Sequence, residues 1–351
     1  MHIALIAPPW LPVPPPAYGG TEIVMDTLAR GLKEAGHDVL LATTGDSTCP
    51  VPRTWVYEKA RPDDLSNVVI ELRHLLHAYE AVAGADIVHD HTIAGPLLAY
   101  RTRTHPVVTT NHGPFTADAK ALYCSTALTV PLIAISKHHA STAGDVPVAR
   151  VIHHGLDTTR FPVGRGGGGY ALFLGRMSPT KGVDTAITVA RQAGMPLVIA
   201  AKQRERNERD YFEAEVRPLL GRGVDYVGEV GGLEKLRLLG DATALLNPIG
   251  WAEPFGMCMI EALACGTPVV ATPRGSVPEI VDDGFTGFIR ASIPTLAAAL
   301  GDVGRLERRA CRASVEERFS MQRMAADHLA FYADVLDGHV ARRARLLHNV
   351  A

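Results

Sequence analysis

The chain is poor in cysteine and has no long apolar run. Its five cysteines are scattered, odd in number and never spaced Cys-x-x-Cys, which argues against a disulfide framework or a zinc site. No apolar stretch reaches the length of a membrane span, and the Pro-rich start MHIALIAPPW is too short for a signal peptide. A net charge of -2 gives no sign of a nucleic-acid partner. We therefore expect a soluble, cytoplasmic protein that neither binds nucleic acid nor inserts stably into a membrane.

A repeated strand–helix rhythm runs through the chain. Residues 2–7 predict a buried strand, residues 23–35 a helix and residues 39–43 a second strand, which is typical of a doubly wound α/β sheet. The rhythm pauses at the glycine-rich run 164–169, which predicts a flexible connection, and restarts at residue 170. A length of 351 residues favours two domains. We expect Rossmann-like domains at 1–160 and 161–319, facing each other across a cleft, and a helical segment at 320–351.

Polar residues follow three strands predicted in the first half, at 87–91, 106–110 and 132–136. Ligands bind beyond the carboxyl ends of strands in open α/β sheets, so these residues predict a site. Four histidines lie in this region: His89, His91, His112 and His138. Alternation along a strand would place His89 and His91 on opposite sides, and no acidic or cysteine ligands cluster with them. We therefore expect no metal.

A glycine pair, Gly19-Gly20, precedes the first predicted helix. It lacks the spacing of a dinucleotide-binding turn. Two readings remain open: a tight turn that lets helix and strand pack closely, or a backbone that offers N–H groups to a phosphate or sugar.

The stretch WAEPFGMCMIEALACGTPVV, residues 251–270, carries two glutamates eight positions apart. Glu253 is expected just before a helix, with Pro254 in the first helical position, and Gly266 ends the helical pattern. At the helical rise, Glu253 and Glu261 would be separated by roughly 12 Å. That distance is too long for an acid–base pair on one bond, but it suits two contacts with one extended ligand.

Two cations flank a glycine-bearing loop in the second half. Arg176 and Lys181 lie five residues apart, between Gly175 and Gly182, before a predicted helix. Such a loop offers both charge and N–H donors to a diphosphate. Carboxylates accept hydrogen bonds from sugar hydroxyls, so these cations together with the two glutamates indicate a nucleoside diphosphate sugar.

The motifs GRMSPTKG at 175–182, EPFGMCMIEALACGTPVVAT at 253–272 and PEIVDDGFTGF at 278–288 resemble family 4 retaining glycosyltransferases of the GT-B fold. PPPAYGGTE, VHDH, NHG and HHGLDTTRF match too, so the resemblance covers nearly the whole chain. The chain is most similar to short members with a Pro-rich first loop and the sequence GEVGG, here 228–232. The resemblance also implies a C-terminal helix that crosses back to the N-terminal domain.

By matching position, the resemblance implies a set of catalytic residues: Arg176, Lys181, Glu253 and His112. The donor-binding set that it implies is Gly19, Gly20, Arg176, Lys181, Tyr226, Val227, Glu253, Phe255, Gly256, Met257 and Glu261. Arg176 and Lys181 would hold the diphosphate, while Glu253 would bind the transferred sugar. Glu261 would bind the ribose. For His112 the alternative is an ordinary histidine at the end of a strand. For Tyr226 and Val227 the alternative is a position in the core.

The chemistry implied by the resemblance is transfer of a hexosyl unit, from a UDP-hexose by expectation, to a hydroxyl acceptor. The acceptor would attack from the front face without a metal or other cofactor, and the anomeric configuration would be retained. An epimerase or a phosphorylase of the same fold, or a binding module without catalysis, are the alternatives. The basic tail 339–345 predicts a solvated end, with an anionic surface as its alternative partner.

Overall fold

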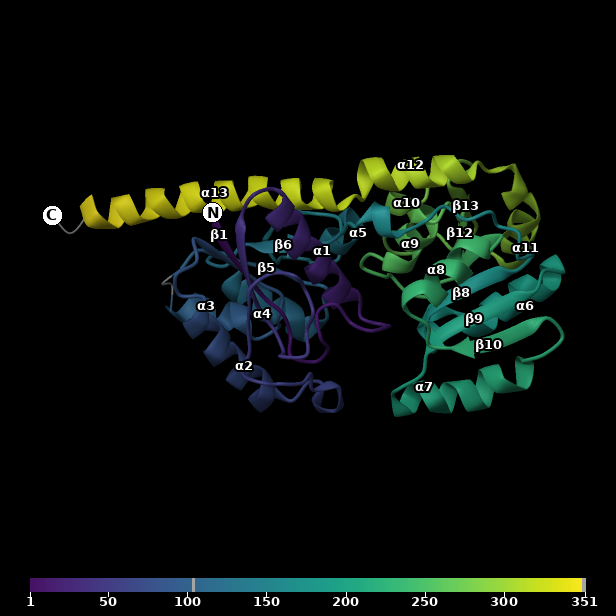
Figure 1. Cartoon of the computed structure of the whole chain (residues 1–351), viewed down its shortest axis with the longest axis horizontal. Helices are drawn as coiled ribbons and strands as arrows, with labels where there is room; N and C mark the ends of the chain where they lie inside the picture. The colour runs from purple at the N-terminus through teal and green to yellow at the C-terminus, as the bar shows by residue number, and fades with distance from the viewer. Residues whose placement is uncertain (103–104, 349–351) are drawn as a thin grey trace. The chain divides into compact units, whose positions relative to one another are not determined.

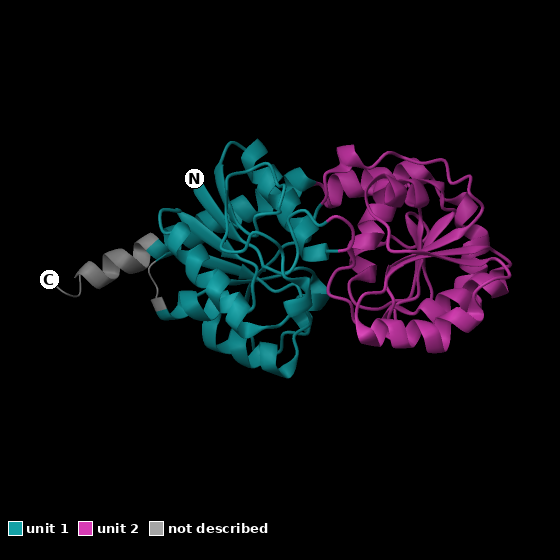
Figure 2. Ribbon diagram, turned by 60° about the horizontal axis from the view of Figure 1, so that its bottom comes forward, with its two compact units in different colours: residues 1–15, 19–155, 321–351 teal, residues 16–18, 156–320 magenta. Residues whose placement is uncertain are grey.

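The computed structural model describes the backbone of residues 1–102 and 105–348, and the side chains of residues 1–101 and 105–339. Two compact units make up the chain (Figure 2). Unit 1 comprises Met1–Pro15, Gly19–Gly155 and Met321–Ala351, and unit 2 comprises Pro16–Tyr18 and Leu156–Ser320. The chain therefore leaves unit 1 after Gly155 and returns to it after Ser320.

Unit 1 is built on a parallel sheet (Figure 1). Within the described residues its strand order is β3-β2-β1-β4-β5-β6-β7. The strands are β1 (His2–Ile6), β2 (Asp38–Ala42), β3 (Arg53–Thr54), β4 (Ile87–Asp90), β5 (Val107–Thr110), β6 (Leu132–Ala134) and β7 (Val148–Val151). The helices are α1 (Gly20–Glu34), α2 (Val68–Ala81), α3 (Gly95–Thr102), α4 (Ala117–Thr126), α5 (Lys137–Ser141) and α13 (Met321–His348). The order reverses beside β1, so right-handed crossovers place α1 on one face and α2 to α5 on the other.

The C-terminal helix α13 packs against α1, the first helix of the chain (Figure 1). The contact is close at Gly31, where an added Cβ would lie 2.9 Å from Met321 Cγ and 3.0 Å from Ala325 Cβ. The predicted return of the C-terminal helix to the N-terminal domain is thus confirmed. The prediction for the basic tail 339–345, a solvated end or a contact with an anionic surface, concerns side chains that lie outside the described residues, except for His339.

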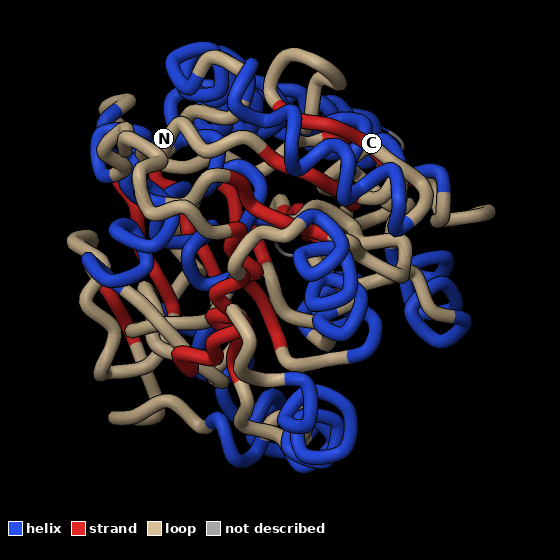
Figure 3. The backbone as a smooth tube through the Cα atoms, turned by 90° about the vertical axis from the view of Figure 1, so that its right-hand side faces the viewer, coloured by secondary structure: helices blue, strands red, loops and turns tan. Residues whose placement is uncertain are grey.

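Unit 2 contains a second parallel sheet, whose order among the described residues is β10-β9-β8-β11-β12-β13. The strands are β8 (Ala171–Arg176), β9 (Leu197–Lys202), β10 (Val224–Gly228), β11 (Ala244–Asn247), β12 (Val269–Ala271) and β13 (Gly287–Ile289). The helices are α6 (Val183–Ala193), α7 (Arg206–Tyr211), α8 (Gly232–Asp241), α9 (Met257–Ala264), α10 (Val277–Ile280), α11 (Ile293–Asp302) and α12 (Arg308–Arg318). Helix α6 packs with α11, while α9 packs with α8 and α12. Figure 3 shows the strands of the fold running among these helices.

The glycine run 164–169 is not the connection between the units, because it is fixed inside unit 2. Gly164 N–H donates to Cys265 O and Gly166 N–H donates to Gly240 O. A Cβ on Gly164 would lie 2.1 Å from Gly240 O, so only glycine allows this approach. The expectation of a flexible linker here was wrong, because the run lies inside unit 2 and close packing explains the glycine at position 164.

Helix α9 begins at Met257, three residues later than expected. Gly256 is its N-cap, with φ of 90°. Pro254 therefore does not occupy the first helical position, and the predicted separation of Glu253 from Glu261 by helical rise does not apply. The sequence pattern missed the left-handed turn that separates Glu253 from the helix.

Candidate functional site

The carboxyl ends of β8 and β11 in unit 2 bring together residues that lie far apart in the chain. Arg176 ends β8, and Lys181 follows in the 3₁₀ turn Pro179–Lys181. Lys181 Nζ donates a hydrogen bond to Glu253 Oε1 and forms an ion pair with it. Both side chains are largely buried. Two predicted site residues, 72 positions apart, thus meet directly.

The Lys181–Glu253 pair fixes the charge of the ammonium group. Burial works to lower the pKa of Lys181, but the neighbouring carboxylate of Glu253 and its hydrogen bond outweigh this, and the pKa is raised. The Lys181 ammonium also lies 5.9 Å from the centre of the Trp251 ring. Lys181 is therefore a cation at neutral pH, with apolar cover on one side.

The backbone around Glu253 is held by the turn that follows β12. Ser276 N–H donates to Glu253 O at 3.1 Å, and Ser276 Oγ donates to Phe255 O. Gly275 has φ of 59°, and a Cβ there would lie 2.3 Å from Glu253 O. This position therefore requires glycine, and the close contact fixes the loop that carries the carboxylate.

Of the predicted sugar-side residues, Phe255 is buried and its ring packs edge-on against Phe319, with the ring centres 6.0 Å apart. Gly256 forms the left-handed N-cap of α9, and Met257 is its first residue. Met259 N–H donates to Gly256 O at 3.1 Å. The N–H groups of Met257 and Cys258, which precede it, come before the first i−4 carbonyl partner of the helix, so they suit sugar or phosphate oxygens.

Glu261 lies on the buried face of α9, with only 5% of its surface exposed. Lys235, from α8, donates to its Oε1 at 2.7 Å. A carboxylate with one oxygen held by a lysine keeps its second oxygen oriented. Lys235 was not predicted, because its partner is 26 residues away and helical spacing gives no signal for such a pair.

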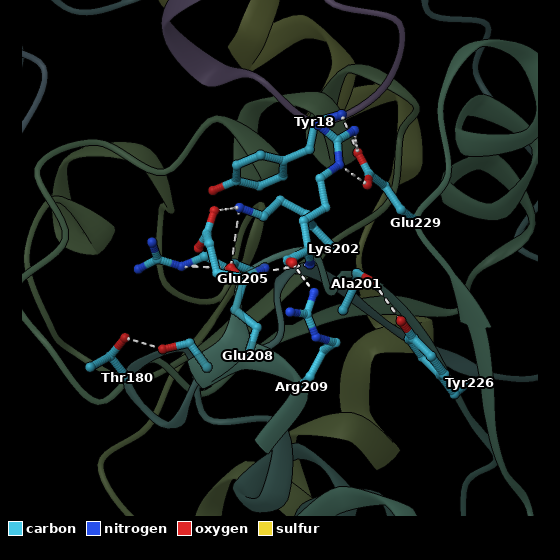
Figure 4. A network of polar contacts seen from close by, with 12 residues as sticks. Tyr18, Thr180, Ala201, Lys202, Glu205, Glu208, Arg209, Tyr226 and Glu229 are labelled. Atoms are coloured by element: carbon cyan, nitrogen blue, oxygen red, sulfur yellow. Dashed lines mark hydrogen bonds and ion pairs between the residues drawn. The ribbon is translucent and has the colours of Figure 1, made fainter. Parts of the chain in front are cut away.

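Arg176 is adjacent to a second charged group, drawn in Figure 4. Its Nε lies 3.7 Å from Glu208 Oε1, and Glu208 also pairs with Lys202 at 3.2 Å. The charged segment 204–217 has the sequence pattern of a solvated helix face, and we expected no chemistry from it. Glu208, however, is only 1% exposed, so this expectation was wrong for that residue.

Tyr226 and Val227 lie on β10. The Tyr226 hydroxyl donates to Ala201 O at 3.0 Å, and its ring lies 4.8 Å from that of Phe212. These contacts favour the core reading of Tyr226. Val227 is exposed.

In unit 1, Gly19 is the N-cap of α1 and Gly20 its first residue. A Cβ on Gly19 would lie 2.7 Å from Pro15 Cγ, which favours the tight-turn reading, whereas a Cβ on Gly20 would meet no atom within 4 Å. Glu22 lies buried in the first turn of the helix. Burial raises the pKa of its carboxyl to about 7, although its own backbone N–H works in the opposite direction.

The partly buried ring of His112 stacks with the buried rings of His91 and His154 beyond β4 and β5. Its Nε2 is 2.8 Å from His91 Nδ1, and its ring centre is 5.2 Å from that of His154. Burial, with smaller contributions from His139 and His328, lowers the pKa of His112 to about 3. His112 is thus held neutral by its surroundings.

Alternation along the strand predicted that His89 and His91 would lie on opposite sides, but their rings lie together. Their centres are 4.0 Å apart. Strand β4 ends at Asp90, so His91 lies outside the pleat. His89 bonds Thr110 and, through Nδ1 at 2.7 Å, the hydroxyl of Tyr332 on α13. His138 lies on α5. Within the described residues, no group of three or more His, Cys, Asp or Glu side chains is arranged to hold a metal ion.

Family models match both units. Residues 18–160 match Glycosyltransferase Family 4, and residues 157–300 match glycosyl transferases group 1. The chain is a family 4/group 1 glycosyltransferase.

Two curated relatives show the range of this glycosyltransferase's likeness. It is 33% identical over 193 residues to glycogen synthase of Mycobacterium tuberculosis, covering 50% of this chain but only 44% of that protein. It is 25% identical over 362 residues to phosphatidyl-myo-inositol mannosyltransferase of Mycolicibacterium smegmatis, covering 91% of this chain and 88% of the other.

Solved structures confirm the GT-B fold of this glycosyltransferase. AviGT4, a glycosyltransferase involved in avilamycin A biosynthesis, is 26% identical with a TM-score of 0.71, covering 96% of this chain and 98% of AviGT4. HepE of Anabaena, in complex with UDP and glucose, is 16% identical with a TM-score of 0.76, covering 95% of this chain and all of that one (100%). Within its described residues, the glycosyltransferase has no helix long and apolar enough to span a membrane.

Proposed function

We propose that this glycosyltransferase moves a hexosyl unit from a nucleoside diphosphate sugar, a UDP-hexose, to a hydroxyl acceptor with retention of the anomeric configuration. The observation that carries the proposal is the contact between Lys181 and Glu253 at the strand ends beside Arg176. This contact joins an ammonium group, which is suited to a diphosphate, to a carboxylate suited to sugar hydroxyls, and so it supports the proposal. The complex of HepE with UDP and glucose supports UDP as the nucleotide.

The roles proposed for unit 2 follow from the donor and acceptor groups present. Lys181 has three N–H donors, so it can keep its bond to Glu253 while a phosphate oxygen takes another. Arg176 offers its guanidinium to the same diphosphate. The first turn of α9, at Phe255–Met257, binds the sugar through backbone N–H groups, and Glu261 binds the ribose. We keep Gly19, Gly20 and His112 as proposed donor contacts from unit 1.

The proposed reaction is a front-face displacement. The bond between the anomeric carbon and the phosphate oxygen breaks, and the acceptor oxygen attacks the same face of the sugar. The departing phosphate takes the acceptor's proton. Lys181 and Arg176 stabilise the negative charge that develops on the diphosphate, which is the charge that a metal ion neutralises in other enzymes. The reaction is therefore proposed to need no metal.

The acceptor belongs to one of three classes: a saccharide, a small molecule or a lipid. The relatives favour the first and last of these, because glycogen and phosphatidyl-myo-inositol appear in their names.

The test is incubation of the purified protein with a panel of UDP-, GDP- and ADP-hexoses, with release of the nucleoside diphosphate as the readout. We expect slow hydrolysis of one nucleotide sugar, UDP-hexose first, at a rate that a metal chelator leaves unchanged. NMR of the transferred sugar in its new glycosidic linkage should show the configuration of the donor. Absence of turnover with every donor would contradict the proposed function, and inversion would contradict the mechanism.

A further inference from the structure

A group of charged side chains, of which Lys202 and Glu208 are buried, lies at the adjoining ends of β8 and β9, where Arg176 and Lys202 are register partners. We call it the Lys202 cluster, and it comprises Arg176, Lys202, Glu205 and Glu208 (Figure 4). Of the sequence motifs that carry the family resemblance, the one at 175–182 contains Arg176, and none contains Lys202, Glu205 or Glu208. Because the strands are parallel, Lys202 and Arg176 end at the same edge of the sheet.

Glu208 is the fixed centre of the Lys202 cluster. Its Oε2 accepts the backbone N–H groups of Arg204 at 2.8 Å and Glu205 at 3.1 Å. Its Oε1 faces Lys202 Nζ at 3.2 Å and Arg176 Nε at 3.7 Å. One buried carboxylate, anchored by two backbone donors, therefore holds Lys202 beside Arg176.

Lys202 has a second carboxylate partner of a different kind. Glu205 also accepts from the Lys202 ammonium, but 43% of the Glu205 side chain is exposed, against 1% for Glu208. An exposed partner can turn into solvent and be replaced by another anion at little cost, whereas a buried partner cannot. Lys202 thus has one permanent counter-ion and one exchangeable counter-ion.

The first loop of the chain covers Lys202 from another side. The ring centre of Tyr18 lies 5.4 Å from Lys202 Nζ, and Tyr18 N–H donates to Glu229 at 2.9 Å. Tyr18 directly precedes the glycine pair for which a phosphate contact is proposed. The ammonium therefore lies against the segment of sequence that leads into that pair.

The charge available to a diphosphate also favours a further cation. Each phosphate of a nucleoside diphosphate sugar carries a negative charge, while Glu253 offsets part of the charge that Lys181 offers to it. Arg176 alone would leave part of that charge without a partner. Lys202, at the neighbouring strand end, can supply it.

We infer that Lys202 is a third cation for the donor's diphosphate, that a phosphate oxygen replaces Glu205 on it, and that Glu208 is the positioning residue that holds Lys202 beside Arg176. This inference rests on the proposed function. If the cluster were only a structural ion pair, Lys202 would affect stability and leave nucleotide affinity unchanged.

The test compares Lys202→Met, Lys202→Arg and the matched control Arg206→Met in calorimetric titrations with uridine, UDP, GDP and ADP. Arg206 is a 91% exposed cation on α7, four residues further along the chain. We expect Lys202→Met to weaken the tightest-bound nucleoside diphosphate by about 10-fold or more, with affinity for the nucleoside unchanged. Lys202→Arg should restore most of the affinity, and Arg206→Met should match the wild type.

Equal affinity of Lys202→Met and wild type for the nucleoside diphosphate would overturn the inference while leaving the proposed function intact. A wild-type protein that binds none of the three diphosphates and turns over no nucleotide sugar would overturn both.

Glu208 is tested by a double-mutant cycle, which also guards against misfolding of Lys202→Met around an unpaired carboxylate. We expect Glu208→Gln to weaken nucleoside diphosphate binding several-fold in the wild type and to have no further effect in Lys202→Met. The double variant removes both charges of the pair, and its circular dichroism should match the wild type. Additive effects of the two substitutions on affinity would overturn the positioning role.

Discussion

Glu261 and its lysine partner separate nucleotide binding from chemistry at the scale of single residues. Lys235 holds one oxygen of the buried Glu261 carboxylate at 2.7 Å, and the proposed ligand of the other is a ribose. We expect Glu261→Gln to raise the donor KM by roughly 10-fold with little change in kcat, because this contact is the same in the ground state and the transition state. Steady-state kinetics with varied donor measure both constants. A fall in kcat at constant KM would contradict the assignment.

Glu22 makes the stability of unit 1 depend on pH. Burial raises the pKa of its carboxyl from 4.5 to about 7. The folded chain therefore binds this proton more tightly than the unfolded chain, and the free energy of unfolding falls as pH rises from about 4.5 to about 7. Glu22→Gln removes that loss. We expect its free energy of unfolding, relative to the wild type, to increase by about 3 kcal/mol between pH 4.5 and pH 8.

Urea unfolding at both pH values measures this difference, with Glu80→Gln, an exposed site on α2, as the control. A difference that does not change with pH would show that Glu22 ionises normally in the folded chain.

Residue motifs indicated the members of the candidate site but not the contacts between them. Arg176, Lys181, Glu253 and Glu261 could be predicted because their spacing around glycine turns is local in the chain. Their contacts could not, since the Lys181–Glu253 pair spans 72 positions and the Lys235–Glu261 pair 26. The sequence did not indicate Lys202 and Glu208 as site residues. A segment rich in charge has the pattern of a solvated helix, and only the folded sheet shows which of its charges are buried.

At the scale of elements, the contact of α13 with β4 depends on a buried hydrogen bond. The Tyr332 hydroxyl and His89 Nδ1 are 2.7 Å apart, and neither residue is exposed. Tyr332→Phe leaves the imidazole nitrogen without this partner, so we expect the free energy of unfolding to fall by about 1–3 kcal/mol. Chemical denaturation measures it. Tyr18→Phe, which removes a hydroxyl from a half-exposed ring, should change stability by far less.

The packing of α1 against α13 depends on the absence of a side chain at Gly31. A Cβ there would lie within 3.0 Å of both Met321 and Ala325. Gly31→Leu must push the helices apart, and we expect a loss of about 1–3 kcal/mol in unfolding free energy. Gly301→Ala is the matched control, because a Cβ at this helical glycine meets no atom within 4 Å and should stabilise the protein slightly. Thermal unfolding of both variants would decide; equal stability of Gly31→Leu and wild type would contradict the packing.

Elements with a clear period were predicted well. The strands predicted at 2–7 and 39–43 differ from β1 and β2 by at most one residue at each end, and the helix predicted at 23–35 overlaps α1, because their apolar patterns lie between turn residues. The start of α9 was missed because a left-handed glycine at position 256, rather than Pro254, begins the helix. The glycine run was misread because glycine permits close packing as well as flexibility.

At the scale of the whole molecule, the chain crosses between the units more than once. Residues 16–18 of the first loop belong to unit 2, and the chain returns to unit 1 at Met321. Helical periodicity predicted the last helix, and the family resemblance its return. Nothing local in the sequence predicted that three residues of the first loop would pack with the second sheet.

The central claim is that the Lys181–Glu253 pair carries the transfer of a sugar from a nucleoside diphosphate. Its most direct test is kcat/KM for the preferred nucleotide sugar in Lys181→Met, Glu253→Gln and the double variant, with Arg206→Met as the control. Each single substitution leaves one buried charge unpaired, which can destabilise the fold. The double variant removes both charges, so a loss of activity in it is a loss of chemistry rather than of folding.

We expect each single variant to lose about 100-fold or more in kcat/KM and the double variant to lose no less, while Arg206→Met equals the wild type. A folded double variant with wild-type kcat/KM would contradict the account.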